Sequence, residues 1–240
     1  MLRFFRKMRS ALIPESRFGR YFFYALGEIA LVVIGILIAL QVNTWNESRK
    51  AGIKERMLLY EMMKNLESTV RKLENMLEGY KRDNFSSAVI ISALENKIEY
   101  NDTLDVHFAL ALNQSSEGSL LSFVSYESLK SSGFDIIRND QLRNEIISLF
   151  ELTYGNLQNK NDRIGQIYPL ISKFKHEHLM RKPGFKFAPY DFKSLAEDKI
   201  FLSWLYSIKD NRSWIAQNIE ISLQETQRVL QLVKYELNEN

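Results

Sequence analysis

The sequence predicts an all-α protein in which an N-terminal transmembrane helix is followed by an antiparallel helical bundle. An apolar run near the N-terminus is long enough to cross a bilayer, and three apolar seams with helical spacing follow it. Turn residues are few, with 4 Pro and 10 Gly in 240 residues, whereas β-sandwiches and barrels need them about every ten positions. We therefore expect a basic tail over 1–20, a membrane helix over 21–45 and a soluble helical bundle over 46–240.

The composition excludes several classes of protein. With 45% hydrophobic and 25% charged residues, the chain is neither a disordered polypeptide nor a polytopic membrane protein. It contains no Cys, which rules out a disulfide scaffold, a thiol nucleophile and a Cys-ligated zinc site. The tail carries a net charge of +5 and the region after residue 45 carries −1. Because the positive charge is not on the folded part, we expect no nucleic-acid partner.

The membrane helix is predicted from the run between Tyr21 and Trp45, in which Glu28 is the single charged residue. As an α-helix, the stretch from Tyr24 to Trp45 would be about 31 Å long, close to the roughly 30 Å hydrocarbon core of a bilayer. Tyr21, Tyr24 and Trp45 are expected at the interfaces, where aromatic side chains are enriched. A cleaved signal peptide is the alternative, but its apolar region would be shorter and would end in a small-residue cleavage pattern.

Basic residues on the two sides of this run predict its orientation. The first twenty residues contain six Lys and Arg side chains, against four in the fifteen residues after Trp45. This bias favours a cytoplasmic N-terminus. The bases of the tail either set the topology alone or also hold the tail against anionic lipid. They are Arg3, Arg6, Lys7, Arg9, Arg17 and Arg20.

Glu28 is the most prominent candidate for function, because an ionisable residue inside a membrane span is usually functional or paired. Three interpretations remain open. The carboxylate reaches the headgroups or a tail base such as Arg20, it pairs with a polar group at a helix interface, or it relays protons.

A stripe of small residues lies beside Glu28 on the predicted membrane helix. Gly27, Gly35 and Ala39 recur at helical spacing, and small residues let two helix backbones approach closely. We therefore expect self-association or docking to a partner helix. The alternative is that the stripe faces lipid.

The rest of the chain is predicted to be helical almost throughout. Apolar residues recur at alternating steps of three and four, the spacing of a coiled coil, and three such seams that cover one another predict an antiparallel bundle. The first seam contains Leu59, Met63, Leu66, Val70, Leu73, Leu77 and Tyr80; the second contains Leu142, Ile146, Leu149, Thr153, Ile164, Ile167, Ile171 and Phe174; the third contains Ile215, Ile219, Leu223, Thr226, Leu230, Val233 and Leu237.

Polar and turn residues mark the boundaries between these helices. Residues 101–103 are predicted to cap a short helix over 104–113, and Gly133 to end a helix over 125–132. Asn139 is predicted to cap the second long helix.

Two further segments interrupt the helical pattern. Pro169, with Gly165 before it, is expected to kink or interrupt the second long helix, because Pro lacks the N–H donor and clashes with the preceding turn. Residues 182–189 contain Pro183, Gly184 and Pro189 and are predicted to be an irregular connection.

No motif indicates catalysis. His176 and His178 are candidate metal ligands. However, residues two apart point to different sides of a helix, and no third ligand lies at useful spacing. We therefore expect these histidines at a solvated helix end. His107 is expected to be a packing residue. Nucleophile-elbow, P-loop, Rossmann and zinc-protease patterns are absent. Carboxylates are expected on solvated helix faces, and we expect no enzyme activity, cofactor or bound metal.

Two stretches carry a distinctive pattern. The first combines FFRKMR at 4–9 with the run from Gly27 to Glu47, in which a Gly-Glu pair enters a long apolar segment. The second runs from Ser125 to Arg143 and contains YESLKSSG. Both resemble a family of small membrane proteins of the Bacteroidota that is assigned only to a domain of unknown function. The resemblance implies a single-span inner-membrane protein with a mostly helical soluble domain, and it implies no activity.

The same resemblance points to Glu28 and to part of the second stretch as positions for function. The alternative for the second stretch is that it only forms a helix, its cap and the start of the next helix. As a possible partner or ligand site it comprises Tyr126, Glu127, Ser131, Ser132 and Gly133.

Taken together, these patterns predict a membrane-anchored helical scaffold or accessory subunit that acts by protein–protein binding. We expect it in the lipid bilayer of a bacterial inner membrane, with a periplasmic C-terminal domain, as a homo-oligomer or bound to a membrane-protein partner. Two alternatives stay open. One is an ion- or proton-linked membrane subunit that uses Glu28; the other is a periplasmic sensor that works through a partner and binds a ligand near Tyr126 and residues 182–190.

Overall fold

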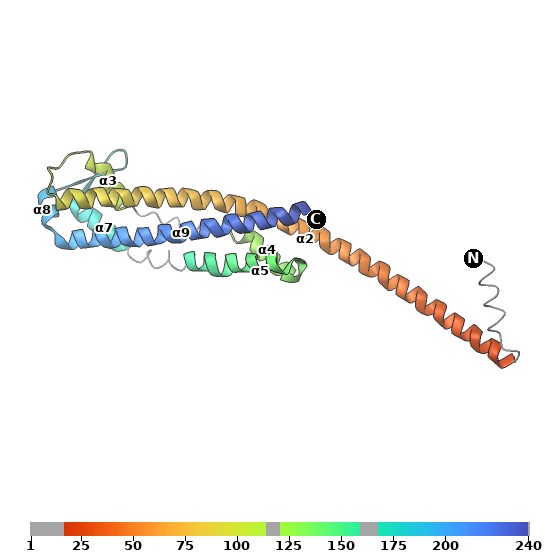
Figure 1. The fold of residues 1–240 in the computed structure, drawn as a ribbon. Helices are drawn as coiled ribbons and strands as arrows, with labels where there is room; N and C mark the ends of the chain where they lie inside the picture. Colours follow the sequence, from red (N-terminus) through yellow and green to blue (C-terminus); the bar gives the residue numbers. More distant parts are fainter. Residues whose placement is uncertain (1–16, 114–120, 159–167, 240) are drawn as a thin grey trace. The chain divides into compact units, whose positions relative to one another are not determined.

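The computed structural model describes residues 17–113, 121–158 and 168–239 (Figure 1). In these residues helices predominate, and the sheet that they contain has two short strands. The predicted all-α class is therefore confirmed, with a long N-terminal apolar helix followed by a helical region. The chain divides into two compact units, Met1–Lys54 and Glu55–Asn240.

The first unit contains the N-terminal part of α2, a helix that spans Arg17–Glu95. An 18-residue window of α2 has a mean hydropathy of 2.4, and none of it is buried within the protein. Its large apolar side chains are exposed, for example Leu31 at 72% and Ile36 at 55%. Exposure of so many apolar side chains to water is unfavourable. This segment is therefore a candidate membrane span.

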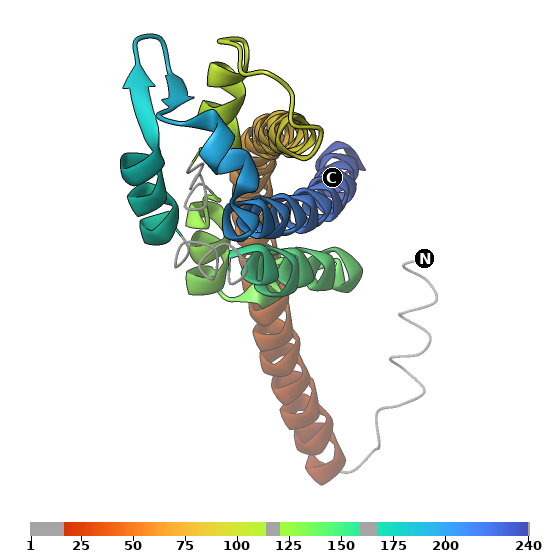
Figure 2. The ribbon, with the colours of Figure 1, turned by 90° about the vertical axis from the view of Figure 1, so that its left-hand side faces the viewer.

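The second unit is built around two long helices. The part of α2 from Glu55 onward lies alongside α9, which spans Lys199–Glu239 (Figures 1 and 2). As the residue numbers rise in α2 they fall in α9, so the two helices are antiparallel. The side-chain contacts that show this order are Glu67–Lys234, Lys81–Glu220 and Tyr206–Glu95.

A third helical segment packs against α9. It consists of α5 (Asp140–Ser148) and the π-helical η2 (Leu149–Tyr154). Asn139 caps α5 as predicted, since its Oδ1 accepts a hydrogen bond from the backbone N–H of Leu142 at 3.1 Å. The hydroxyl groups of Tyr154 and Thr226 lie 2.7 Å apart and join η2 to α9.

The short helices α4 (Val124–Ser132) and η1 (Phe134–Ile136) precede α5. Gly133 separates them, with a φ of +84° that a residue with a side chain rarely adopts. The predicted end of this helix at Gly133 is therefore confirmed.

The predicted seams face the core. Their described members are all buried or half-buried, while Ile164 and Ile167 lie outside the described residues. Fully buried examples from the three seams are Leu66, Leu73, Ile146, Ile219 and Val233.

Smaller elements lie around the end of the second unit where α2 ends (Figure 2). They cover a cluster that includes Phe108, Phe201 and Leu205. The elements are α3 (Leu104–Ala111), α7 (Tyr168–His178), β1 (Leu179–Lys182), β2 (Lys186–Pro189) and α8 (Phe192–Glu197).

The prediction of an irregular connection over 182–189 is wrong for most of its length. β1 and β2 pair as an antiparallel hairpin, with Leu179 opposite Pro189 and Lys182 opposite Lys186. Gly184 in the turn has a φ of +80°. A loop of three to five residues that contains Gly, between two short runs, is a hairpin signal, and the interpretation of the sequence did not use it.

Pro169 is the second residue of α7. The residues directly before Tyr168, Gly165 among them, lie outside the described residues. A kink or interruption at Pro169 therefore stays a prediction.

Candidate functional site

The predicted membrane residues lie on α2. Tyr21 and Trp45 are exposed, at 78% and 65%. Glu28 and Ala39 are also exposed, and Arg17, Arg20 and Tyr24 lie in the N-terminal part of the helix. A Cβ added to Gly27 or Gly35 would meet no atom within 4 Å, so none of the residues that the structure describes packs on these two glycines. The roles of these residues stay predictions, and Arg3, Arg6, Lys7 and Arg9 lie outside the described residues.

The residues predicted as a partner or ligand site on α4 do not converge. Tyr126 is 2% exposed, and its ring stacks on Phe150 with centroids 4.6 Å apart. Its hydroxyl donates to Glu151 Oε1 at 2.8 Å, and burial together with this carboxylate raises the pKa of Tyr126. Tyr126 is therefore part of the core. By contrast Glu127, Ser131 and Gly133 are exposed and Ser132 is half-buried.

The three histidines lie where the sequence analysis placed them, two at a solvated helix end and one in a packed position. His176 and His178 are exposed at the end of α7. His107 Nδ1 lies 3.1 Å from Ser86 Oγ, and its ring packs edge-on against Phe85. Within the described ranges no group of three or more His, Cys, Asp or Glu residues could hold a metal ion.

Arg212 on α9 is a buried residue that the sequence interpretation missed. It is 6% exposed, and its guanidinium donates to the backbone oxygens of Ala111 at 2.8 Å and Asn113 at 2.7 Å, and to Ser87 Oγ at 3.1 Å. The last carbonyls of a helix have no partner within it and carry partial negative charge. Arg212 therefore closes the C-terminal end of α3 and ties it to α2 and α9.

Buried carboxylates also contradict the expectation that acidic side chains lie on solvated faces. Asp83 is fully buried and accepts from Asn113 Nδ2 at 3.0 Å. Glu55, at 6% exposure, accepts from the backbone N–H of Arg138 at 2.8 Å. A signal was present in the sequence, because Asp83 follows Tyr80 by three residues and therefore continues the first apolar seam.

A third buried carboxylate, Asp105 on α3, is 1% exposed. It accepts from the hydroxyl of Tyr100 and, at 2.8 Å, from Nζ of Lys182 at the end of β1. Hydrogen bonding to Asp105 raises the pKa of Lys182. Burial, followed by the effect of Asp105, raises the pKa of Tyr100. This cluster joins the segment after α2, the helix α3 and the hairpin.

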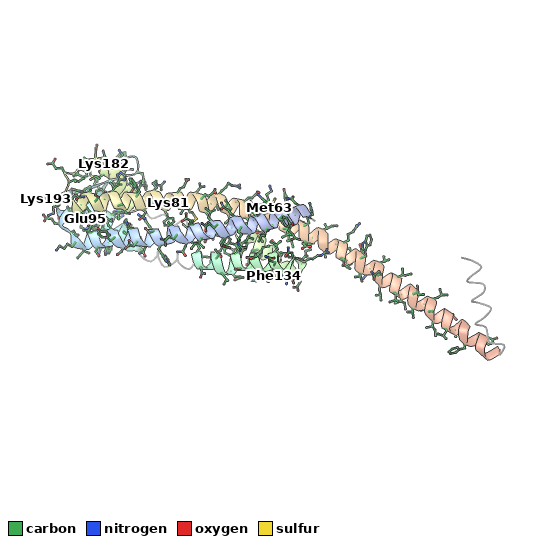
Figure 3. The ribbon with its side chains drawn as sticks, viewed as in Figure 1. Met63, Lys81, Glu95, Phe134, Lys182 and Lys193 are labelled. Atoms are coloured by element: carbon green, nitrogen blue, oxygen red, sulfur yellow. The ribbon has the colours of Figure 1, made fainter. Side chains whose placement is uncertain are left out.

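A cavity of about 460 Å³ adjoins this cluster. It lies between the segment that follows α2 and the helix α8, and its apolar lining consists of Ile98, Tyr100, Phe192 and Ala196. The rings of Tyr100 and Phe192 are 5.6 Å apart. Figure 3 shows Glu95, Lys182 and Lys193 at this end of the second unit, with Met63 and Phe134 toward the other. Among the described residues, this cavity is the candidate functional site.

The Asp105 cluster predicts a loss of stability at alkaline pH. The folded state raises the pKa values of Lys182 and Tyr100, so it holds their protons more tightly than the unfolded chain. Their stabilising contribution is therefore complete at neutral pH and is lost as the pH rises through these raised pKa values, above about 10. The measurement is the urea midpoint of the wild type and of Lys182→Met between about pH 8 and about pH 11.

The wild type should be the more stable at the lower pH, and the difference should shrink as the pH rises. Lys186→Gln, on the opposite strand, is the control. A difference that does not depend on pH would contradict the assignment.

The sequence pattern of a family described as a family of unknown function, DUF6090, matches residues 28–170, more than half of the chain. The chain belongs to the DUF6090 family. No curated protein and no solved structure matches it. The DUF6090 match begins at Glu28 and includes α3, α4 and α5, whereas α8 and α9 lie beyond it. One wall of the cavity therefore lies inside the DUF6090 region and the other, α8, lies outside it.

Proposed function

We propose that the protein is a membrane-anchored helical scaffold or accessory subunit that acts by binding other proteins. The observation that carries this proposal is the double role of α2. It contains the candidate membrane span in the first unit, and it supplies one of the two long helices of the second unit. An anchor confines the folded unit to the membrane surface, which raises its effective concentration toward partners in the same membrane.

In this proposal the anchor crosses a bacterial inner membrane once, with the N-terminus in the cytoplasm and the folded unit in the periplasm. The excess of Lys and Arg before the span supports this orientation. The resemblance to Bacteroidota membrane proteins supports the choice of membrane.

Association would involve the stripe of Gly27, Gly35 and Ala39. Within residues 17–113, 121–158 and 168–239 no side chain covers the two glycines, so a second helix could approach the backbone closely there. The partner is a second copy or another membrane protein. We propose no catalytic step, since the buried Arg212, Asp83 and Asp105 are engaged in hydrogen bonds that hold helices together.

The test is purification of the tagged full-length protein from its native membrane in mild detergent, with the mass and composition of the particle measured together. A closed homo-oligomer or a stoichiometric partner would support the proposal, and a monomer without a partner would contradict it. Orientation is tested with a reporter after Asn240. An active periplasmic phosphatase is expected there, and a fluorescent cytoplasmic reporter at the same position would overturn the orientation.

Substitutions in α2 separate the scaffold function from the ion-linked alternative. Glu28→Gln is expected to leave membrane content, particle mass and cellular function as in the wild type, because the scaffold does not require a titrating carboxyl group. Gly35→Leu is expected to reduce the assembled fraction about tenfold, because its side chain separates the helices. Leu37→Ile is the matched control.

The measurement is the particle mass of each variant together with complementation of a deletion strain. Loss of complementation by Glu28→Gln in a normally assembled particle would contradict the scaffold proposal and favour ion or proton transfer.

A further inference from the structure

We propose that the cavity beside α8 binds a short peptide with free amino and carboxyl ends and one large apolar side chain. This inference goes beyond the anchoring and assembly proposed above, since it assigns a ligand to the second unit itself. Three features carry it: the size and apolar floor of the cavity, the fixed position of that floor, and the charges around it.

The cavity has the dimensions of a ligand site. Its volume of about 460 Å³ falls within the roughly 300–1,000 Å³ of small-molecule pockets. Ile98 and Tyr100 of its floor are 41% and 37% exposed, so they offer apolar surface to an incoming group. Phe192 contributes a third face and is supported from behind by Phe108, edge-on with centroids 6.4 Å apart. An aromatic or branched aliphatic side chain would bury this surface.

The floor is fixed before any ligand arrives. The hydroxyl of Tyr100 donates to Asp105, and the other carboxylate oxygen of Asp105 accepts from Lys182 at 2.8 Å. Because Asp105 is 1% exposed, moving Tyr100 would leave a buried acceptor unpaired, which is costly. A preformed surface loses little conformational freedom on binding, and affinity rises accordingly.

The charges around the floor match a zwitterion. Lys97 and Glu99 line the cavity from the segment after α2. Lys193 and Glu197, which are four residues apart on α8, line it from the other side. In the part of the chain that the structure describes, none of these four side chains forms an ion pair. Two charges of each sign disfavour a polyanion such as nucleic acid and can pair with a ligand that carries both signs. A free peptide carries one ammonium and one carboxylate group.

The test is isothermal titration of the full-length protein, purified in mild detergent, with three tripeptides. The first is Gly-Phe-Gly with free ends, the second is the same peptide with an acetylated amino end and an amidated carboxyl end, and the third is Gly-Gly-Gly. We expect Gly-Phe-Gly to bind with a Kd on the order of 10–100 µM. The other two should bind at least about tenfold more weakly, because one lacks the terminal charges and the other the apolar side chain.

Variants locate the binding. Ala196→Phe fills the cavity and should abolish binding of Gly-Phe-Gly, while an unchanged circular dichroism spectrum verifies folding. Lys193→Gln and Glu197→Gln, both at exposed positions, should each weaken binding about three- to tenfold. The matched controls are Lys186→Gln and Glu74→Gln, which remove exposed charges elsewhere in the second unit and should leave the Kd unchanged.

Several results would overturn the proposal. These are no binding of Gly-Phe-Gly, equal binding of the blocked peptide or of Gly-Gly-Gly, or full binding by a folded Ala196→Phe protein. None of them bears on the particle mass or on the membrane topology, so failure of this inference and failure of the proposed scaffold function are separate observations.

Discussion

Arg212→Leu is expected to lower the free energy of unfolding by about 3–5 kcal/mol, the range measured when one partner of a buried charged network is removed. The guanidinium satisfies the backbone oxygens of Ala111 and Asn113 and the hydroxyl of Ser87. Leu fills part of the volume but donates nothing, so these buried acceptors lose their partners, each at a cost of about 1–3 kcal/mol. Against a total stability of about 5–15 kcal/mol, this loss is large.

The measurement is urea denaturation of the full-length protein in mild detergent, followed by circular dichroism. Arg228→Leu is the matched control, because Arg228 lies on the same helix but its side chain is 45% exposed in its pair with Glu145. An exposed ion pair contributes about 0–1 kcal/mol. Arg212→Lys should be intermediate, since an ammonium group cannot reproduce the planar fork of donors. A loss below about 1 kcal/mol for Arg212→Leu would show that Arg212 does not hold the helices together.

Phe150→Ala is expected to cost about 3–5 kcal/mol, because truncation of a buried aromatic residue removes apolar contacts and leaves a cavity. Phe150 is 1% exposed, stacks on Tyr126 and meets Tyr154 edge-on at 5.1 Å. Phe150 lies in the π-helical η2, and its ring contacts the rings of both Tyr126 and Tyr154. Its loss should therefore also release Tyr126.

The free energy of unfolding and the near-ultraviolet circular dichroism of Phe150→Ala report the two effects. Leu152→Ala is the matched control in the same segment. Leu152 is 62% exposed, so its truncation should change the stability by no more than about 0.5 kcal/mol. Equal losses for the two variants would show that the aromatic cluster around Phe150 is not a part of the core that supports the fold.

The seams, the cap at Asn139 and the helix end at Gly133 were predicted well because they depend on local spacing. The cap predicted over 101–103 was wrong, since Thr103, which precedes α3, makes no side-chain cap hydrogen bond. Leu66, Ile146 and Val233 belong to three different seams. In each seam, a helix of 3.6 residues per turn brings the apolar residues to one face of that helix, and all three residues are buried. The cap at Asn139 and the helix end at Gly133 depend on residues within one turn. None of these features requires knowledge of what lies across the core.

The candidate site was not predicted, because its parts come from distant segments. Tyr100, Asp105 and Lys182 are unremarkable as sequence, and the predicted ligand residue Tyr126 belongs to a different cluster of the core. Lys182 was assigned to an irregular connection, whereas the hairpin carries its side chain to Asp105, 77 residues earlier in the chain. The cavity itself forms only where the segment after α2 packs near α8, almost one hundred residues later in the chain.

The apolar span, the long helices and their inward-facing sides follow from the sequence alone, because hydrophobicity and periodicity are properties of short segments. Which buried charges meet depends on the packing of distant segments. Arg212 acquires its role from the carbonyl groups at the end of α3, about one hundred residues away. A buried charge is tolerated only where other elements supply partners, and those partners depend on how the helices are arranged in space.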